Sequence, residues 1–257
     1  MPERDLALLI DAARAAGEIA LRYWQNAPET WDKHDASPVT EADLAVNDML
    51  QARLLQARPT YGWLSEESVD TDARLDSEHV FIIDPIDGTR AFIAGETHFS
   101  HSLAVARKGK VTAAAIYLPA LDCMYTATEN GPAEMNGQPI HTAHRVLADG
   151  VNLLTPKVNL EPDFWNGDPP QVKRSFRASI AYRMCLVADG SFDGILSFRD
   201  AWEWDIAAGA LIAARAGAMV SDGRGQAIEF NSPKARAAGI FAASPPLHAE
   251  LSARFKA

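Results

Sequence analysis

Two aspartates, Asp84 and Asp87, directly follow an apolar run near the middle of the chain. The run itself, Val80–Ile83, holds three β-branched residues and a phenylalanine, which predicts a buried strand. Carboxylates beside a buried strand are costly unless a cation neutralises them, and hard cations such as Mg²⁺ take oxygen ligands. The spacing therefore indicates a divalent-metal site. A plain strand-to-turn exit with an Asx cap would explain the same residues.

The residues that come next are suited to binding an anion. Gly88 allows a tight turn and lets a ligand approach the backbone. If a helix begins at Thr89, its free N–H groups point towards the same place. Two metal-binding acids beside such a helix start describe a site for phosphate esters.

Three elements in the first third of the chain must help to position this site. The spacing of apolar residues predicts an amphipathic helix over Asp5–Trp24. A second helix is expected after Thr40, a good N-cap, with Asp43 at the capping-box position. A short strand from Tyr61 then runs into two adjacent acids, Glu66–Glu67. Capping alone explains Asp43, and adjacent acids are usually only solvated.

The rest of the chain predicts an antiparallel sheet followed by an α/β half. Strands are expected between Ser100 and Tyr125, where His98 and His101 are three residues apart but lie in no zinc-type motif. Two units are predicted, residues 1–145 and 146–257, with a junction over 145–171. The second unit should contain a strand at 151–154, a helix after Arg177, a strand at 193–198, a helix from Asp205 and a closing hairpin over 220–230.

The composition limits which classes of function and which cellular compartment fit this sequence. With 47% hydrophobic residues among 257, the chain can bury a full core. A formal net charge of −10 argues against non-specific binding to nucleic acid or anionic membranes. Cys123 and Cys185 both lie in apolar runs, which favours buried free thiols in a reducing compartment. No signal-peptide pattern or membrane-length apolar run is present, so a cytoplasmic location is expected.

Four stretches occur together in a fixed order: Ser37–Asp43, Ser65–Glu67, Asp84–Thr89 and Trp204–Gly209. Together they resemble the inositol monophosphatase superfamily of lithium-sensitive, Mg²⁺-dependent phosphomonoesterases, over nearly the whole chain. The resemblance implies an α+β or α/β fold, built as a layered αβαβα sandwich. It also implies two or three bound Mg²⁺ ions.

The resemblance assigns the metal ligands. Glu66, Asp84 and the carbonyl of Ile86 would hold one Mg²⁺. Asp84, Asp87 and Asp205 would hold a second, with Asp84 bridging. Glu66 would also help to position a third, weaker ion.

The resemblance likewise implies catalytic and substrate-binding roles. Thr89, paired with Asp43, would help to deprotonate the attacking water, and Glu66 would act beside them. The Gly88 and Thr89 amides would hold the phosphate, and Asp87, Asp205 and Ser179 are also expected to contact substrate. Lys33 lies where the family has a lid lysine, in a polar connection up to Pro38 that is long enough to be mobile.

Four positions look like the 3'(2'),5'-bisphosphate nucleotidase branch of this superfamily. Ser65 replaces the glycine common before the paired acids, and Arg90 follows Asp-Gly-Thr. Phe198 stands where inositol phosphatases place an acid that binds sugar hydroxyls, and an aromatic there could stack on a base. Arg183 could contact a second phosphate or could simply be a surface helix residue. The stretch Trp202–Trp204 differs from both branches.

The leading hypothesis is therefore a phosphatase that removes the 3'-phosphate of adenosine 3',5'-bisphosphate with metal-activated water. The alternative is inositol-1-monophosphatase or histidinol-phosphatase activity at the same metal site. A hypothesis of another class, a non-catalytic binder of phosphate ligands, is disfavoured because every expected ligand acid is retained. The expected partner is a small phosphorylated substrate, with no nucleic acid polymer and no membrane, and a homodimer is left open.

Overall fold

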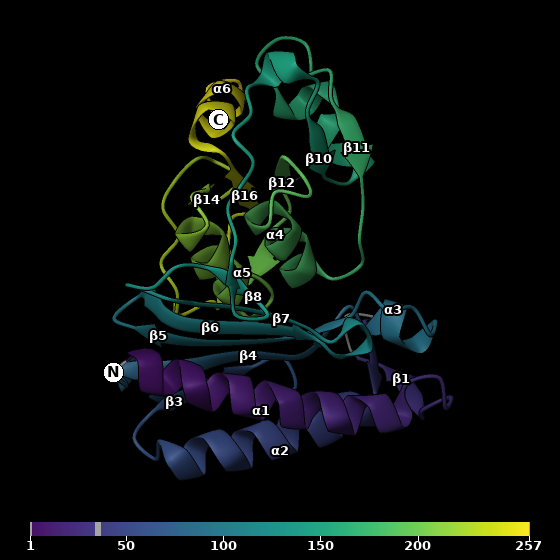
Figure 1. The fold of residues 1–257 in the computed structure, drawn as a ribbon, viewed down its shortest axis with the longest axis vertical. Coiled ribbons are helices and arrows are strands. Elements are labelled where there is room, and N and C mark those ends of the chain that lie inside the picture. Colours follow the sequence, from purple (N-terminus) through teal and green to yellow (C-terminus); the bar gives the residue numbers. More distant parts are fainter. Residues whose placement is uncertain (1, 34–36, 257) are drawn as a thin grey trace.

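Five alternating layers of helices and sheets make up the structure, a computed structural model that describes residues 2–33 and 37–256 (Figure 1). In order, the layers are a helix pair, a large sheet, a second helix pair, a smaller sheet and a last helix. This arrangement confirms the predicted layered αβαβα sandwich. The layer helices are α1 (Pro2–Tyr23) and α2 (Glu41–Ala57), then α4 (Ile180–Ala188) and α5 (Glu203–Arg215), then α6 (Pro245–Ser252).

The large sheet has seven strands in the order β3-β4-β5-β6-β7-β8-β9. Only the β3–β4 pair is parallel; each later pair is antiparallel. Asn136 and Gly137 have φ values of 49° and 76°, as a two-residue hairpin turn between β8 and β9 requires. The strands are β3 (Gly62–Ser65), β4 (His79–Asp87), β5 (Ser100–Arg107), β6 (Lys110–Leu118), β7 (Cys123–Thr128), β8 (Glu134–Met135) and β9 (Gln138–Pro139).

The smaller sheet has five strands in the order β11-β10-β12-β16-β14, and two further strand pairs, β1–β2 and β13–β15, stand apart from both sheets. The strands of the smaller sheet are β10 (Asn152–Leu154), β11 (Lys173–Ser175), β12 (Gly194–Ser197), β14 (Met219–Ser221) and β16 (Ile240–Ala243). The separate pairs are β1 (Thr30–Asp32) with β2 (Pro38–Thr40), and β13 (Ala201–Trp202) with β15 (Arg236–Ala237). Short helices are α3 (Thr89–Ile93), η1 (Asp72–Asp76), η2 (Pro119–Leu121), η3 (Leu147–Asp149), η4 (Lys157–Leu160) and η5 (Pro162–Phe164).

The closing hairpin predicted over residues 220–230 is wrong. β14 pairs with β16 instead, and residues 226–230 form no strand. A turn forms after β14, where the Asp222 side chain accepts hydrogen bonds from the N–H groups of Arg224 and Gln226. Beyond it the chain reaches the large sheet, where the N–H of Phe230 donates to the carbonyl of Gly109 and the ring is buried between the layers.

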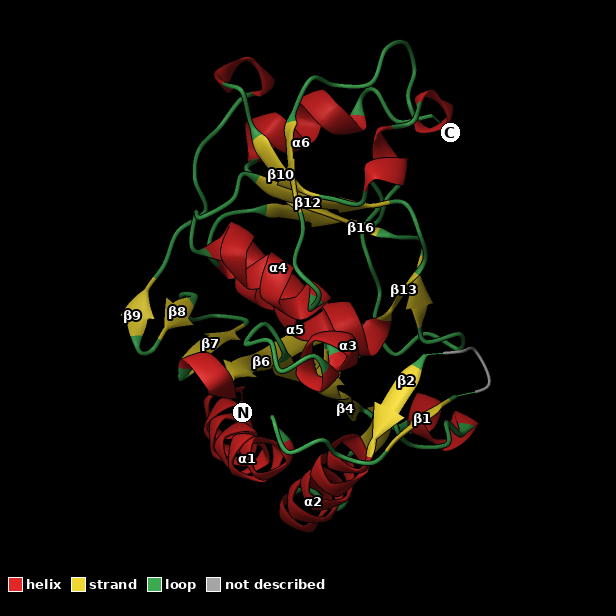
Figure 2. Cartoon of the chain, turned by 90° about the vertical axis from the view of Figure 1, so that its right-hand side faces the viewer, coloured by secondary structure: helices red, strands yellow, loops and turns green. Residues whose placement is uncertain are grey.

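Strand β4 is covered on both faces by helices. Phe81 and Ile83 pack towards α1 and α2, whereas Val80 and Ile82 pack towards α4 and α5. Both faces of the strand are therefore buried, as its continuous apolar run predicts. Figure 2 shows α4 and α5 lying between the two sheets. Among the described residues, no helix combines the length and the apolarity needed to cross a bilayer.

Helices α4 and α5 approach each other closely at Gly209. A Cβ atom at that position would lie 2.7 Å from both Cβ and Sδ of Met184. This contact sets the spacing between the two helices. The spacing matters for the site because α4 and α5 each carry predicted site residues.

We expect Gly209→Ala to force these two helices apart and to lower the free energy of unfolding by about 1–3 kcal/mol, the usual cost of overpacking a core. Chemical denaturation measures the loss. Ala214→Ser, on the exposed side of the same helix, is the control and should stay within about 0.5 kcal/mol of the wild type. Equal stability of the two variants would contradict the tight contact.

Candidate active site

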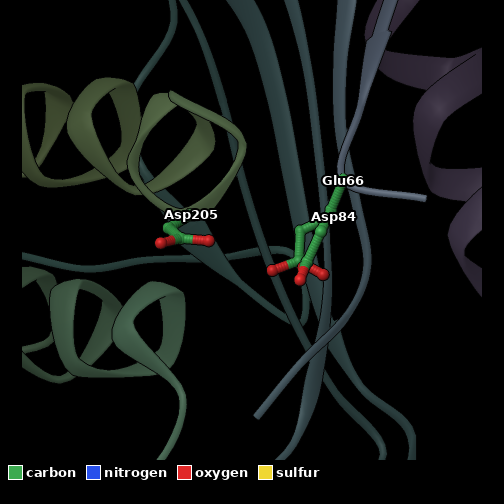
Figure 3. Close-up of side chains that lie close together, drawn as sticks. All are labelled: Glu66, Asp84 and Asp205. Carbon is green, nitrogen blue, oxygen red and sulfur yellow. The ribbon is translucent and has the colours of Figure 1, made fainter. Parts of the chain in front are cut away.

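Three predicted metal ligands meet at one edge of the large sheet. Because β3 and β4 are parallel, their carboxyl ends lie side by side, and the N–H of Glu66 donates to the carbonyl of Ile83 at 3.2 Å. This places Glu66 next to Asp84, while the first turn of α5 carries Asp205. Figure 3 shows Asp205 pointing from its helix towards the other two. One carboxylate oxygen from each residue lies within 4.8 Å of the others.

Asp84 is the most constrained of these acids. It is 1% exposed, and its Oδ1 atom has no hydrogen-bond partner among the described residues. Burial raises its pKa well above the ordinary carboxyl value, and Glu66, Asp87 and Asp205 raise it further. Burial and the charges of Asp87 and Glu66 likewise raise the pKa of Asp205. A divalent cation would offset the repulsion among these acids and would bind the carboxylate oxygen that receives no hydrogen bond. Because all the ligand atoms are oxygens, the site suits Mg²⁺.

Asp87 is held by the start of helix α4. Its Oδ2 atom accepts hydrogen bonds from Ser179 Oγ at 2.5 Å and from the N–H of Ala181 at 2.7 Å. Burial raises the pKa of Asp87 to about 6 against the lowering effect of these bonds. Asp87 lies outside the group of three whose oxygens converge within 4.8 Å. It is near enough to repel Asp84 and Asp205, and its role as a ligand stays a prediction.

The structure brings Thr89 and Asp43 together. Gly88 is the N-cap of α3 with φ of 97°, and Thr89 Oγ1 lies 3.4 Å from Asp43 Oδ1 and 3.1 Å from the carbonyl of Ile86. The other oxygen of Asp43 accepts from the N–H and the hydroxyl of Thr40, so the predicted capping box is confirmed. Burial raises the pKa of Asp43 to about 6. Asp43 therefore combines the capping role with a contact to Thr89.

Lys33 also lies at the site. Its Nζ atom is 2.7 Å from Glu66 Oε1 and 2.6 Å from Glu67 Oε1. Burial disfavours the charged ammonium, but Glu66 and Glu67 together raise the pKa of Lys33 above its usual value. Burial, and next the charge of Glu66, raise the pKa of Glu67 to about 7. The antiparallel β1–β2 pair holds Lys33 here, while residues 34–36 of the expected lid lie outside the described residues.

Arg183 is a buried cation on α4, not a surface residue. It is 7% exposed, its Nε donates to the carbonyl of Ser179 at 3.3 Å, and its guanidinium lies 4.9 Å from the ring centre of Phe176. Burial lowers its pKa, and the charges of Asp87 and Asp205 oppose that shift. The structure therefore places a positive charge beside the acids.

Two residues that favour the nucleotidase branch are used in packing. Phe198 stacks on Phe164 with ring centres 4.8 Å apart and an interplanar angle of 5°, and it meets the rings of Trp165 and Phe255. One face of its ring is thus covered by an aromatic neighbour. Ser65 is buried and donates through Oγ to Oδ1 of Asn47 at 2.8 Å. Neither contact supports a substrate-specific role.

His101 is a site residue that the sequence did not reveal. It is fully buried on β5, and its Nδ1 lies 2.5 Å from the carbonyl of Pro85, to which it donates. Burial lowers its pKa to about 4, so the ring is neutral. Since Pro85 lies between Asp84 and Asp87, this bond holds the end of β4 that carries these two acids. Its only sequence signal, the three-residue spacing to His98, belongs to no zinc-type motif and does not indicate this bond.

Comparisons with known proteins agree on one family. The sequence profile of the Inositol monophosphatase family matches residues 1–256. The Inositol-1-monophosphatase of Rhizobium meliloti is 35% identical over 203 residues, 75% of each chain. The Nus factor SuhB of Pseudomonas aeruginosa is 30% identical over 232 residues, 84% of each chain. The solved structure of a Thermotoga maritima IMPase has a TM-score of 0.83 at 26% identity and covers 98% of this chain and 96% of its own.

These relatives carry inositol monophosphatase or SuhB names and no bisphosphate nucleotidase name. The branch that Ser65, Arg90 and Phe198 favour in the sequence is therefore not supported by them. The inositol-1-phosphatase alternative has the better support.

The raised carboxyl pKa values predict how metal binding depends on pH. In the metal-free fold Asp87 keeps its proton up to about pH 6, whereas an unfolded aspartate loses it near 3.8, so metal-free stability should fall as pH rises through this window. Bound Mg²⁺ must displace such protons. We therefore expect Mg²⁺ to raise the Tm more at about pH 7.5 than at about pH 5.

Thermal unfolding with EDTA and with Mg²⁺ at both pH values measures this difference. Asp205→Asn should reduce the Mg²⁺-dependent rise in Tm at the higher pH. A rise of the same size at both pH values would show that the acids bind metal without losing protons.

Proposed function

The chain belongs to the inositol monophosphatase family, whose members are Mg²⁺-dependent phosphatases, and from this premise we propose that it hydrolyses the phosphate monoester of a small polyhydroxylated alcohol, with inositol-1-phosphate as the leading substrate. The observation that carries the proposal is the convergence of carboxylate oxygens of Glu66, Asp84 and Asp205 within 4.8 Å of one another, together with the Oδ1 atom of Asp84 that lacks a donor. The name of the Rhizobium meliloti relative supports the substrate.

The acids supply what hydrolysis of a phosphate monoester needs. Such a reaction depends mainly on positioning and on stabilising charge, and needs little covalent help. Glu66, Asp84 and Asp205 would hold Mg²⁺, with Asp87 and the carbonyl of Ile86 as the further ligands that the family resemblance implies. When bound, Mg²⁺ supplies charge stabilisation and an activated water.

Thr89 and Asp43 would orient the attacking water and take up its proton. The hydroxyl of Thr89 can donate to Asp43 Oδ1, which leaves its oxygen free to accept a hydrogen from water. A carboxylate with a pKa of about 6 is suited to accept a proton near neutral pH. Cys123 and Cys185 are poor nucleophiles, since burial raises both thiol pKa values. Direct attack by water therefore fits the site.

The phosphate would lie against the start of α3. Gly88 forms the turn into this helix, and the N–H groups of Gly88 and Thr89 are the expected donors to phosphate oxygens. Ser179 fixes the opposite wall through its bond to Asp87. We assign both segments to substrate binding.

A second candidate is removal of the 3'-phosphate from adenosine 3',5'-bisphosphate. The observation that favours it is the buried guanidinium of Arg183 beside Asp87 and Asp205, which offers a positive charge in addition to bound metal. The ring of Phe198, engaged with Phe164, adds no support for a base-stacking site.

We expect Asp84→Asn to lower kcat on any substrate at least about a hundredfold, because it removes a negative charge that would hold Mg²⁺ at the site. Asp48→Asn, on the exposed side of α2, removes the same charge far from the acids and serves as the control. Turnover of inositol-1-phosphate, adenosine 3',5'-bisphosphate and histidinol phosphate with Mg²⁺ is the measurement.

Full activity of Asp84→Asn would contradict catalysis at this site. Absence of turnover by the wild type on all three substrates would favour a non-catalytic binder. A marked preference for the adenosine bisphosphate would replace inositol-1-phosphate by the second candidate.

A further inference from the structure

A pocket lies towards the opposite end of strand β4 from the acids. Its volume is about 390 Å³, within the range of small-ligand sites. Val80 lines it and stands four residues before Asp84, which corresponds to roughly 13 Å along the strand. The pocket is therefore separate from the candidate active site. Its lining comes from the entry to β4, the β5–β6 hairpin and the segment after β14: Leu75, Ser77, Glu78, Val80, Ala106, Lys108, Gly109 and residues 229–233.

One wall of the pocket belongs to a strap, residues 231–236, that holds the first turn of α5. The fully buried carboxylate of Glu203 accepts hydrogen bonds from the N–H groups of Asn231 and Ser232, at 2.5 and 2.9 Å. Glu203 is the first residue of α5, and the predicted metal ligand Asp205 is the third. Asn231 and Ser232 thus line the pocket and also bind the helix turn that carries Asp205.

The other end of the strap contacts the same turn. The N–H of Glu203 donates to the carbonyl of Ala235 at 2.9 Å. Arg236 pairs with Trp202 between β15 and β13, and its guanidinium lies 3.5 Å from the centre of the Trp202 ring. That ring stacks on Trp204 with centres 4.5 Å apart and an interplanar angle of 14°. The stretch Trp202–Trp204, which differs from both branches of the superfamily, is therefore where the strap meets the helix.

The strap is also anchored on the side away from α5. The buried guanidinium of Arg74 donates to Asn231 Oδ1 at 2.6 Å and to the carbonyl of Ser232 at 3.0 Å. Asn231 has a φ of 59°, in the left-handed region, so its backbone is held in a sparsely populated conformation. Since the strap is bonded on both sides, a molecule that contacts it in the pocket acts directly on the start of α5.

The charges of the pocket favour a neutral ligand. Glu78 and Glu229 would repel an anion, and Lys108 would repel a cation. Across residues 2–33 and 37–256, Glu229 belongs to no ion pair, so its carboxylate can accept hydrogen bonds from a ligand. The hydroxyl of Ser77 and the ammonium of Lys108 can donate, and Val80 offers an apolar contact. A neutral molecule with several hydroxyl groups and a C–H face matches this lining.

We propose that this pocket binds a small neutral polyol and that the strap couples its occupancy to Mg²⁺ binding at Asp205. The inference rests on the proposed function for the source of the ligand. Hydrolysis of a polyol phosphate releases a neutral polyol, whereas the substrate is an anion that Glu78 and Glu229 disfavour. Polyol and metal bind more tightly together, because both favour one arrangement of the first turn of α5. The pocket is then a regulatory site that senses the product.

Titration with myo-inositol tests the pocket without any turnover. Ligand-observed NMR should detect inositol binding to the wild type in EDTA, and binding at least about fivefold tighter with saturating Mg²⁺. Calorimetric titration of Mg²⁺ should show the same factor when inositol is saturating, because coupling between two sites is reciprocal. Gluconate and glucamine, an anionic and a cationic polyol, should bind at least about fivefold more weakly than neutral sorbitol.

Variants separate the pocket from the strap. Ser77→Ala with Glu229→Ala removes two lining polar groups and should weaken inositol binding about tenfold, with or without Mg²⁺. Glu18→Ala, on the exposed side of α1, is the control and should bind as the wild type does. Glu203→Gln turns an amide NH₂ towards a strap N–H and should abolish the coupling while inositol still binds. If circular dichroism shows that this buried substitution does not fold, Arg236→Ala removes the exposed guanidinium and should lower the coupling factor at least about twofold.

Failure of the pocket is distinct from failure of the proposed function. If the chain hydrolyses no phosphate ester but shows coupled binding of inositol and Mg²⁺, the pocket stands and the proposed hydrolysis fails. Inositol binding that survives the Ser77 and Glu229 double variant would place the polyol at the acids instead and overturn the proposal. Absence of inositol binding, or equal affinity with and without Mg²⁺, would also overturn it. Full coupling in the folded strap variants would overturn the route through residues 231–236.

Discussion

Mutual repulsion among buried carboxylates is the constraint on which the rest of this structure depends. Asp84 and Asp205 are held so close to one another and to Glu66 that burial and like charge raise the pKa values of both aspartates. Such a cluster is unfavourable by itself and becomes favourable only when cations share it. The acidic cluster therefore lowers the free energy of unfolding of the metal-free protein, and metal binding raises it again.

The scaffold holds the acids in place from several directions. The parallel β3–β4 pair sets Glu66 beside Asp84, and the N-terminal turn of α4 holds Asp87 through Ser179. His101, neutral and buried, holds the Pro85 carbonyl between the two aspartates. These supports come from a strand pair, a helix start and the neighbouring strand β5. Asp84, Asp87 and Asp205 sit on regular elements, and Glu66 directly follows β3. Regular elements keep ligands in position better than flexible loops do.

Reaction and substrate are specified by different parts of the molecule. The acids, Thr89 and Asp43 lie at the edge of the large sheet and would supply the chemistry common to the family. Substrate choice would depend on the surrounding wall, where the buried Arg183 supplies positive charge to an otherwise acidic protein. A residue that suggests substrate specificity in the sequence can have a structural role instead. Ser65 donates a hydrogen bond to Asn47, and Phe198 stacks on Phe164.

The sequence by itself determined the features that depend on near neighbours along the chain. The capping box at Thr40 and the buried strand before Asp84 follow from local backbone preferences and apolar spacing, and the motif order indicated the family. Only the tertiary structure decided which distant groups meet. The ion pair of Lys33 with Glu66, the bond from His101 to Pro85 and the pairing of β14 with β16 join segments separated along the chain. Such contacts depend on how whole layers pack against one another. A local sequence pattern is compatible with several distant partners, and only the packing of the core determines which one it meets.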